Sequence, residues 1–411
     1  MRIAIIGGGA VGLCSAVALA RAGHGVTVFD PATARAAPSW NNAGHVATEQ
    51  VAPLASLAML RSAPKRRFAA GGALDLPRKH WPTWLPFGLR LTAAARPARF
   101  RAGQDALRAL LAEAGPAWAR LERDLGHPDL FREAGHLVVW ESAATAADGR
   151  RAWESADIGT ASITDPSAAD RALLNRIVAS ARVGGAIRFH GTGQVRDLSA
   201  LASALEQTLA GLDGQIVRRA VKPTLQDGRA VVPGHDADLV LVAAGVASGG
   251  LMRGLGHRTV PIVAERGYHI RAAADAWPAD ACPVVFEDRS MIVTRYAGAV
   301  QAASFVEIAR PDAPPDPSKW ERLEHHVAAL GLPMQAPFTR WMGARPTLPD
   351  YLPAIGRSAQ ASNLVYAFGH QHLGLTLAPL TGELVAGLID GGAPAIDLAR
   401  FDIDRFSRFG R

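Results

Sequence analysis

The hydrophobic and polar positions change their period twice within the first thirty residues. A continuous apolar run from Ile3 to Ile6 predicts a buried parallel strand, and the apolar positions over 10–22 recur at helical spacing. After Gly23, the segment from Gly25 to Asp30 predicts a second strand that ends on a carboxylate. Strand, turn, helix and strand in this order predict the opening of a Rossmann-like domain.

The rest of the chain alternates between helical and strand patterns. Apolar side chains recur at helical spacing over 104–125, which predicts one amphipathic helix with Trp118 in the core. Other helices are expected over 173–181, 198–212, 318–330 and 375–389, with Pro379 in the first turn of the last one. Strands are expected over 135–140, 186–189, 215–221, 238–245, 260–270, 284–286, 291–296, 300–306 and 363–368.

The turn after the first strand carries Gly7, Gly9 and Gly12 in G-x-G-x-x-G spacing. The first glycine makes the tight turn, the second lets backbone approach a pyrophosphate, and the third lets the helix pack on the strand. The helix N-terminus then presents free N–H groups to that pyrophosphate. Asp30 can accept hydrogen bonds from the ribose hydroxyls of an adenine dinucleotide, but its charge would repel a 2′-phosphate. The motif therefore predicts NAD or FAD without deciding between them, and it disfavours NADP.

Length and composition limit the class of protein. A chain of 411 residues with 49% hydrophobic residues can bury a large core and is expected to form two domains. No apolar run approaches eighteen residues, so no transmembrane helix is expected, and a fold that begins at residue 2 is expected to leave no room for a cleaved targeting peptide. The two cysteines, Cys14 and Cys282, are too few for a disulfide framework or a cysteine metal site, which fits a reducing cytoplasm.

The formal charge of +7 is concentrated in one window with ten Lys or Arg and a single acid, Asp75. Of the 44 basic and 37 acidic residues, 34 and 36 lie outside this window, so the remainder is close to neutral. Aromatic residues interleave with the charges, and Pro and Gly are expected to break any long helix. The window is a solvated loop-rich face, a docking surface for anionic lipid, or a nucleic-acid site; the last is not expected, because no recognised binding motif accompanies it. The basic residues are Arg61, Lys65, Arg66, Arg67, Arg78, Lys79, Arg90, Arg96, Arg99 and Arg101.

A Gly-Ala-Arg-Pro sequence surrounds Arg345. An amino-acid substrate brings a carboxylate into a dry pocket, and an arginine can hold it with two parallel N–H bonds that a lysine cannot reproduce. The competing interpretation is a structural ion pair of Arg345 with Asp350 or Glu383.

Several separated motifs, in order along the chain, resemble one known family. They are the glycine-rich start, the segment Ser39-x-x-Asn42-Ala43-Gly44, the Gly-x-Arg-Pro segment and the turn from Gly369 to Gly374. Together they resemble the D-amino-acid dehydrogenase branch of the FAD-dependent D-amino-acid oxidase family, over nearly the whole chain. The resemblance implies an α/β fold with an interrupted Rossmann-like FAD-binding domain over 1–55, 165–257 and 338–411. A substrate domain with a mixed or antiparallel sheet would comprise 56–164 and 258–337.

The resemblance also implies which residues bind FAD. The last helix is expected to aim its N-terminus at the isoalloxazine, where its dipole would stabilise negative charge on the reduced ring. The implied cofactor residues are Gly7, Gly9, Ala10, Val11, Gly12, Asp30, Ser39, Asn42, Ala43, Gly44, Val221, Ala244, Gly245, Arg266, Gly369, Gly374, Leu375 and Thr376.

In the substrate site, the resemblance gives Arg345 the role of binding the substrate carboxylate. Relatives carry a tyrosine at the position of Gln50, and Tyr268 or Tyr296 is the candidate replacement. His370 is expected to orient the turn rather than to act as a base. No His-Cys-Asp constellation suggests a metal, and none is expected. The expected substrate-site residues are Arg345, Tyr268, His45, Gln50 and His372.

The resemblance implies oxidative deamination of a D-amino acid, in which a Cα hydride passes to flavin N5 and the imino acid hydrolyses to a 2-oxo acid. Small cyclic substrates, D-proline or 4-hydroxy-D-proline, are the favoured guess. The electron acceptor would be a quinone or another carrier, and the chain would be cytoplasmic and peripheral on the inner face of the membrane. A sarcosine- or glycine-type oxidase using oxygen and an RNA-binding flavoprotein are the alternatives. The sequence leaves open the handedness, the side chain, the acceptor and the oligomeric state.

Overall fold

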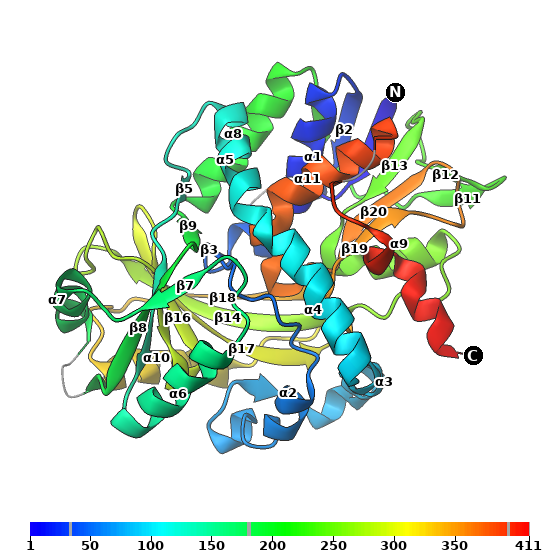
Figure 1. The fold of residues 1–411 in the computed structure, drawn as a ribbon. Helices are drawn as coiled ribbons and strands as arrows, with labels where there is room; N and C mark the ends of the chain where they lie inside the picture. Colours follow the sequence, from blue (N-terminus) through cyan, green and yellow to red (C-terminus); the bar gives the residue numbers. More distant parts are fainter. Residues whose placement is uncertain (33–34, 179–181, 393–394, 411) are drawn as a thin grey trace.

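The computed structural model describes residues 1–32, 35–178, 182–392 and 395–410. Two large sheets lie side by side, and the strands of the N-terminal and C-terminal segments meet in one of them (Figure 1). Helices cover both faces of that sheet. The other sheet is mixed, and its strands come from the middle of the chain. The expected α/β fold with two sheets is confirmed.

The six-stranded sheet has the order β10–β2–β1–β13–β20–β19, and only β19 runs antiparallel to its neighbour. Its central strands are buried on both faces, which explains their continuous apolar sequences. The strand–helix–strand start is confirmed within a residue at each boundary. The strands are β1 (Arg2–Ile6), β2 (Gly25–Phe29), β10 (Gln215–Val217), β13 (Leu239–Val242), β19 (Ala354–Arg357) and β20 (Leu364–Phe368).

Two helices from opposite ends of the chain cross closely on one face of this sheet. A Cβ on Gly382 would lie 2.7 Å from the carbonyl oxygen of Cys14, so glycine permits the approach. The stretch Gln371–Asp390 is long and apolar enough to cross a membrane, but 67% of it is buried, which identifies it as a core helix. The helices around the sheet are α1 (Ala10–Arg21), α5 (Ala114–Leu125), α8 (Leu198–Gly211), α9 (Ser248–Gly254) and α11 (Gly374–Asp390).

The nine-stranded sheet has the order β18–β14–β17–β16–β15–β6–β8–β7, and β4 pairs with the end of β17. The long pair that β14 forms with the edge strand β18 is antiparallel and regular, and it sets Glu265 opposite Arg345. The strands are β4 (Leu74–Asp75), β6 (His136–Trp140), β7 (Ser162–Thr164), β8 (Gly185–His190), β14 (Val263–Ala273), β15 (Val284–Phe286), β16 (Met291–Arg295), β17 (Ala299–Ala309) and β18 (Thr339–Thr347).

The remaining elements surround these two sheets. Two small sheets are formed by β3 (His45–Val46), β9 (Gly193–Val195) and β5 (Phe131–Arg132), and by β11 (Thr224–Gln226) and β12 (Arg229–Val231). The other helices are α2 (Leu57–Ser62), α3 (Trp81–Ala94), α4 (Pro97–Ala112), α6 (Ala143–Ser155), α7 (Ala168–Ile177) and α10 (Pro317–Leu330).

Strand pairing differs from the predicted domain boundaries in two places. β8 and β18 fall in segments predicted to belong to the FAD-binding domain, yet both pair within the nine-stranded sheet.

The strand expected over 215–221 ends at Val217, so Val221 lies beyond it. The helix expected over 173–181 begins earlier, at Ala168, and residues 179–181 lie outside the described residues.

Proline altered the helices in ways that the pattern did not predict. The single helix expected over 104–125 is two helices, α4 and α5, that meet at Glu113. Pro116 lacks the N–H that would continue the hydrogen-bond ladder, so the first helix ends before it. Conversely, α3 runs for 14 residues through Pro86, although its window was expected to form no long helix. Pro379 is the sixth residue of α11, so its expected place in the first turn was wrong.

Candidate active site

The glycine turn after β1 is closed by backbone contacts that leave no room for side chains. Gly7 has φ +116°, and a Cβ there would lie 2.4 Å from the carbonyl oxygen of Ala243. A Cβ on Gly12 would lie only 1.9 Å from the carbonyl oxygen of Gly7. A Cβ on Gly9 would meet nothing closer than the Ser39 hydroxyl at 3.2 Å, so this position stays open on its outer side. The turn and the start of α1 therefore form a backbone cradle that fits a pyrophosphate.

The segment of residues 39–44 is fastened to this cradle. The Ala10 N–H donates to Ser39 Oγ at 3.0 Å. Asn42 accepts the Gly44 N–H at 2.6 Å and donates to the Ser39 carbonyl at 2.8 Å, which folds the segment around Ala43. The implied cofactor residues of both segments therefore share one surface.

The carboxylate at the end of β2 lines a cavity of about 210 Å³. Asp30 accepts the N–H groups of Gly8 at 2.6 Å and Ala32 at 2.8 Å, so its position is fixed by backbone. The cavity matches the place where the adenosine end of a dinucleotide would lie. Its other lining residues include Arg35, Ala37, Trp40, Glu206 and Arg218.

The turn before α11 reaches the same region from the far end of the chain. Gly369 has φ +81°, and Gly374 is the first residue of α11. Thr376 Oγ1 accepts the N–H of Ala47 at 3.0 Å, joining the start of α11 to the segment that follows Gly44. Leu375 is buried beside it. Residues separated by some 330 positions thus meet, and their backbone N–H groups, glycines and helix N-terminus fit FAD.

Four other implied residues flank this surface. Ala244 and Gly245, which has φ +57°, follow the carboxyl end of β13 next to the glycine turn. Val11 lies in the first turn of α1 and packs against the core under it. Val221 is half-buried beyond β10 and packs against the core on one face of the six-stranded sheet.

Arg345 reaches the site from β18 and contacts the buried carboxylate of Glu265. Its Nη1 lies 3.2 Å from Glu265 Oε1 and donates to the Phe305 carbonyl at 3.2 Å. A Cβ on Gly267 would lie 2.5 Å from Nη2, so the guanidinium rests on glycine backbone. Its side chain remains 28% exposed, whereas that of Glu265 is 2% exposed. Part of the guanidinium is therefore available to a ligand.

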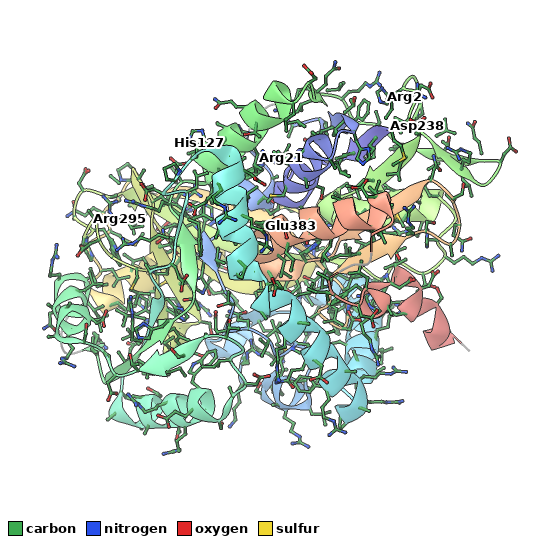
Figure 2. The ribbon with its side chains drawn as sticks, turned by 45° about the horizontal axis from the view of Figure 1, so that its top comes forward. Arg2, Arg21, His127, Asp238, Arg295 and Glu383 are labelled. Carbon is green, nitrogen blue, oxygen red and sulfur yellow. The ribbon has the colours of Figure 1, made fainter. Side chains whose placement is uncertain are left out.

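The competing ion pairs predicted for Arg345 are not formed. Asp350 pairs with Arg405 at 2.7 Å, and Glu383 pairs with Arg120 at 2.8 Å where α5 crosses α11 (Figure 2). The ion-pair partner of Arg345 is Glu265 instead, and Glu265 also accepts a hydrogen bond from the Tyr351 hydroxyl at 3.1 Å.

A line of buried and part-buried polar side chains begins at His372, whose imidazole feels the charge of Arg345. His372 Nε2 donates to Gln50 Oε1, and Gln50 Nε2 donates to Glu49 Oε1 at 3.2 Å. His45 Nε2 lies 3.6 Å from the same carboxylate oxygen. Burial, reinforced by the charge of Arg345, lowers the pKa of His372 to about 3, so its imidazole is neutral at pH 7. The structure thus brings four of the five expected substrate-site residues together.

Tyr268, the fifth, and Arg266 lie elsewhere, which contradicts their expected roles. Side chains alternate along β14, so both point away from the face that carries Glu265 and Arg345. The Tyr268 hydroxyl donates to Glu307 Oε2 at 2.5 Å, and Arg266 donates to the Pro314 carbonyl at 2.9 Å. Both are fully buried beneath α10. Tyr296, the other candidate, donates to the Asn42 carbonyl at 2.6 Å and supports the cofactor segment instead.

Three site residues were not predicted from the sequence. Glu49 and Glu265 adjoin recognised motifs, but nothing in their spacing shows that they are buried. His136 lies in β6, far from any motif, and its ring stands edge-on to that of His45 at 4.7 Å.

Acid should destabilise the protein through its buried histidines. Burial lowers the pKa of His269, His370 and His372 from 6.5 to about 3. The folded state therefore favours the neutral form, and the stabilisation is complete above pH 6.5 and is lost as the pH falls toward 3. The expected loss is about 1.4 kcal/mol per pH unit for each histidine.

Thermal unfolding at pH 7 and pH 5 checks this expectation. A His269→Leu variant should lose less stability between the two values than the wild type. A His127→Leu variant, whose exposed imidazole is labelled in Figure 2, should behave like the wild type. An unchanged loss in His269→Leu would contradict the assignment of buried neutral histidines.

Comparison with known proteins agrees with the fit of FAD to the glycine turn and to residues 39–44. A family model described as FAD dependent oxidoreductase matches residues 2–388. The chain is 31% identical to a D-amino-acid oxidase of Bradyrhizobium diazoefficiens, covering 98% of each chain. It is 30% identical to a D-amino acid dehydrogenase of Cereibacter sphaeroides, covering 100% of this chain and 97% of the other.

Solved structures share the fold at lower sequence identity. Glycine oxidase from Geobacillus kaustophilus superposes with a TM-score of 0.72 at 21% identity, covering 98% of this chain and 99% of that one. L-proline dehydrogenase from P. horikoshii superposes with a TM-score of 0.73 at 16% identity, covering 99% and 98%. Because the second of these names an L-substrate, the fold by itself does not determine handedness.

Proposed function

We propose, since this chain belongs to the family of FAD-dependent oxidoreductases, that it is a D-amino-acid dehydrogenase. FAD is the cofactor of the family, and the glycine cradle, the segment of residues 39–44 and the start of α11 fit it. The similarity to a D-amino-acid oxidase and a D-amino acid dehydrogenase supports the substrate class. The observation that carries the proposal is the partly exposed guanidinium of Arg345 on the face of the sheet that also carries buried Glu265.

The residues of the chain would bind and orient the substrate rather than take its protons. Bound FAD supplies a hydride acceptor for the Cα hydrogen. Arg345 would hold the carboxylate by two N–H bonds, which fixes the direction of the Cα–H bond and can supply several kcal/mol of the barrier. Neutral His372 and Gln50 form the wall beside it. The amine enters deprotonated, so no fixed base is required. The imino acid formed adds water and hydrolyses to a 2-oxo acid. A primary amine leaves as ammonia, whereas the ring of a proline-type substrate opens and keeps its nitrogen as an amine.

Among small substrates, the polar wall favours 4-hydroxy-D-proline over D-proline. Gln50, Glu49, His45 and His372 form a line of buried and part-buried polar groups in which Glu49 Oε2 has no hydrogen-bond partner. A substrate hydroxyl would donate to this oxygen, whereas an apolar ring would leave it unpaired at a cost of about 1–3 kcal/mol.

The visible spectrum of the holoenzyme, kept anaerobic, tests the proposal. The D- and L-forms of proline, 4-hydroxyproline, alanine and arginine, together with sarcosine and glycine, are added in turn. Bleaching of the oxidised flavin by D-forms alone is expected, with 4-hydroxy-D-proline the fastest. Bleaching by sarcosine or glycine would favour a secondary-amine or glycine oxidase, and a yellow protein that no D-amino acid bleaches would exclude the proposed substrate class.

We propose further that the protein is cytoplasmic and docks on the inner face of the membrane, where a quinone accepts its electrons. The face of α3 carries Trp81, Leu85 and Leu89 at positions i, i+4 and i+8, with exposed fractions of 58%, 41% and 66%. Leu57 of α2 is also exposed, and both helices lie on the lower side of the molecule in Figure 1. A helix with one exposed apolar face is typical of interfacial membrane binding.

The charges around this face are not neutralised within the chain. The window of residues 61–101 contains a single acid, Asp75, and it is bound to Lys319 at 2.7 Å. Apart from Arg99, none of the ten basic residues forms an ion pair in the described part of the chain. Each basic residue near an anionic surface contributes about 1 kcal/mol to binding, which favours anionic lipid as the partner.

Replacement of the apolar face by serine should release the protein from vesicles. The triple variant Trp81→Ser, Leu85→Ser, Leu89→Ser should bind vesicles of phosphatidylglycerol and phosphatidylcholine at least about tenfold more weakly, measured by sedimentation. Leu225→Ser, an exposed leucine on β11, is the matched control and should bind normally. Undiminished binding of the triple variant, or salt-sensitive retention of RNA instead of vesicles, would exclude this docking surface.

A further inference from the structure

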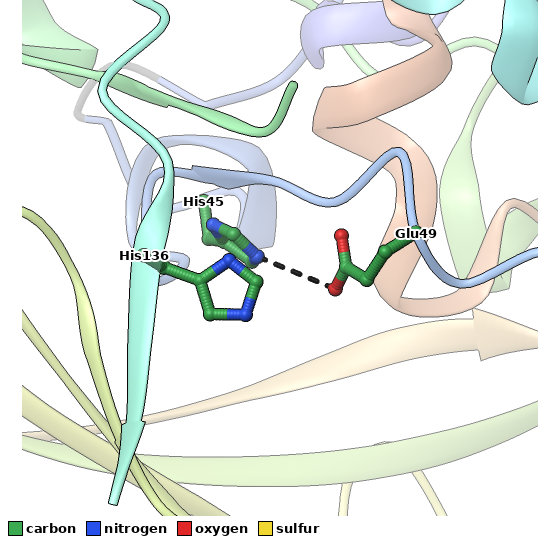
Figure 3. A group of neighbouring side chains, drawn as sticks. All are labelled: His45, Glu49 and His136. Carbon is green, nitrogen blue, oxygen red and sulfur yellow. Dashed lines mark ion pairs between the residues drawn. The ribbon is translucent and has the colours of Figure 1, made fainter. Parts of the chain in front are cut away.

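Three buried side chains from separate parts of the chain converge beside the substrate site. His45 belongs to β3, Glu49 follows that strand by three residues, and His136 lies in β6 (Figure 3). One nitrogen or oxygen from each lies within 4.8 Å of the others. The side chains of His45 and Glu49 are 9% and 2% exposed, and His136 is also buried. Two imidazoles and a carboxylate in such an arrangement need a reason to be buried together.

The tautomer of His45 is fixed by the backbone. Its Nδ1 lies 3.2 Å from the Gly193 carbonyl, which can only accept, so Nδ1 carries a hydrogen. In a neutral ring, Nε2 then has a lone pair directed at Glu49 Oε1, 3.6 Å away. Glu49 Oε1 accepts a hydrogen bond from Gln50, whereas His45 Nε2 and Glu49 Oε2 have no hydrogen-bond partner. A buried imidazole lone pair that faces a carboxylate is stabilised by a cation between them.

His136 is oriented in a similar way. Its Nδ1 makes a hydrogen bond with Thr192 Oγ1 at 2.9 Å, and its ring stacks on Phe189 with centroids 4.4 Å apart. Nε2 is therefore the nitrogen left free of a protein hydrogen bond, and in Figure 3 it lies on the side of the ring that faces Glu49. A backbone carbonyl and a hydroxyl that hold the far nitrogens of two histidines are the outer-shell partners found around metal ligands.

We propose that His45, Glu49 and His136 bind a divalent transition-metal ion of the Zn²⁺ type. In a tetrahedral zinc site with bonds of 2.0–2.1 Å, neighbouring ligand atoms are about 3.3 Å apart. The observed separation of 3.6 Å between His45 Nε2 and Glu49 Oε1 is close to this value and too long for a hydrogen bond. A proton on His45 would draw the pair to about 2.8 Å and would leave His136 without a role. Two histidines and a glutamate leave one position open for water.

Titration of the chelator-treated holoenzyme with Co²⁺ and Zn²⁺ tests the proposal without reference to the substrate. One equivalent of Co²⁺ should bind and give a ligand-field band at longer wavelength than the flavin, with the intensity of four- or five-coordination. One equivalent of Zn²⁺ should abolish the band. His136→Gln and Glu49→Gln should each weaken binding about 100-fold, since loss of an outer-shell partner alone costs up to that much. His190→Gln, on the exposed end of β8, is the control and should bind normally.

Binding that is equal in His136→Gln, Glu49→Gln and the wild type would overturn the site. The absence of a stoichiometric cobalt complex would do the same, and a protonated His45 paired with Glu49 would then explain the cluster. If either variant loses FAD, the cobalt spectrum of the wild type tests the site instead. A weak six-coordinate band without nitrogen ligands would overturn the proposal. An intense band with nitrogen ligands would support it. Bleaching by D-amino acids is measured separately, so failure of the substrate assignment and of the metal site can be distinguished.

Discussion

A Gly12→Ala variant is expected to lose FAD and to fold poorly. The added Cβ would lie 1.9 Å from the Gly7 carbonyl oxygen and 3.0 Å from the Gly7 carbonyl carbon. Both atoms belong to the turn itself, so no side chain can move aside to relieve the overlap. The start of α1 would have to leave β1, which carries its free N–H groups away from the pyrophosphate. Overpacking of this kind typically costs 1–3 kcal/mol or more, and here it falls on the cofactor contact.

The ratio of flavin to protein absorbance after gel filtration, with the melting temperature, measures this loss. Gly115→Ala is the matched control, because it adds the same methyl group to α5 at a position with nothing within 4 Å. Alanine is the better helix former, so the control should be unchanged or stabilised by up to about 1 kcal/mol. If Gly12→Ala retained a full equivalent of FAD, the close helix–strand contact would not be what holds the cofactor.

The start of the fold could be predicted from the sequence because its signals are local. β1, α1 and β2 end within a residue of the expected positions, since glycine and the change of hydrophobic period mark each boundary. Proline misled the prediction in α3 and α11, where neighbouring packing tolerates one lost hydrogen bond inside a helix. At Pro116 it acted in the expected direction and divided one predicted helix into two.

The cofactor surface could be predicted from separated motifs, whereas the wall of the substrate site could not. The approach of α11 and the turn before it to the segment after Gly44 involves the bonds from Ala47 N–H to Thr376 and from His372 to Gln50, which no spacing reveals. The roles of Arg266 and Tyr268 were predicted wrongly, because a strand pattern does not say which face of the strand meets the ligand. In β14 the side chain of Glu265 lies on the face that carries Arg345, and Arg266 and Tyr268 lie on the opposite face. The meeting of Glu49 with His136 depends on the register of two sheets, which only the folded chain fixes.

The largest functional loss should follow from Arg345→Leu. The substrate carboxylate would lose two charge-assisted hydrogen bonds, worth about 2–5 kcal/mol in a buried site, so kcat/KM should fall about 100- to 1000-fold, mainly through KM. FAD should remain bound, because Arg345 contacts none of the cofactor segments in the described structure. Steady-state kinetics with the best D-amino acid and a dye acceptor measure the change. Turnover that survives within about threefold would show that Arg345 does not bind the carboxylate.

Removal of Arg345 also leaves Glu265 as a buried charge without its cation, and two variants separate this structural effect from substrate binding. A stability loss of about 3–5 kcal/mol is expected in Arg345→Leu, and adding Glu265→Gln should recover most of it. Activity should not return in that double variant, because the amide restores the core but supplies no cation for the substrate. Arg340→Leu, which removes an exposed arginine on the same strand that pairs with Glu324 at 2.8 Å, should change neither property by much. Activity that recovered together with stability would mean that Arg345 serves only to neutralise Glu265.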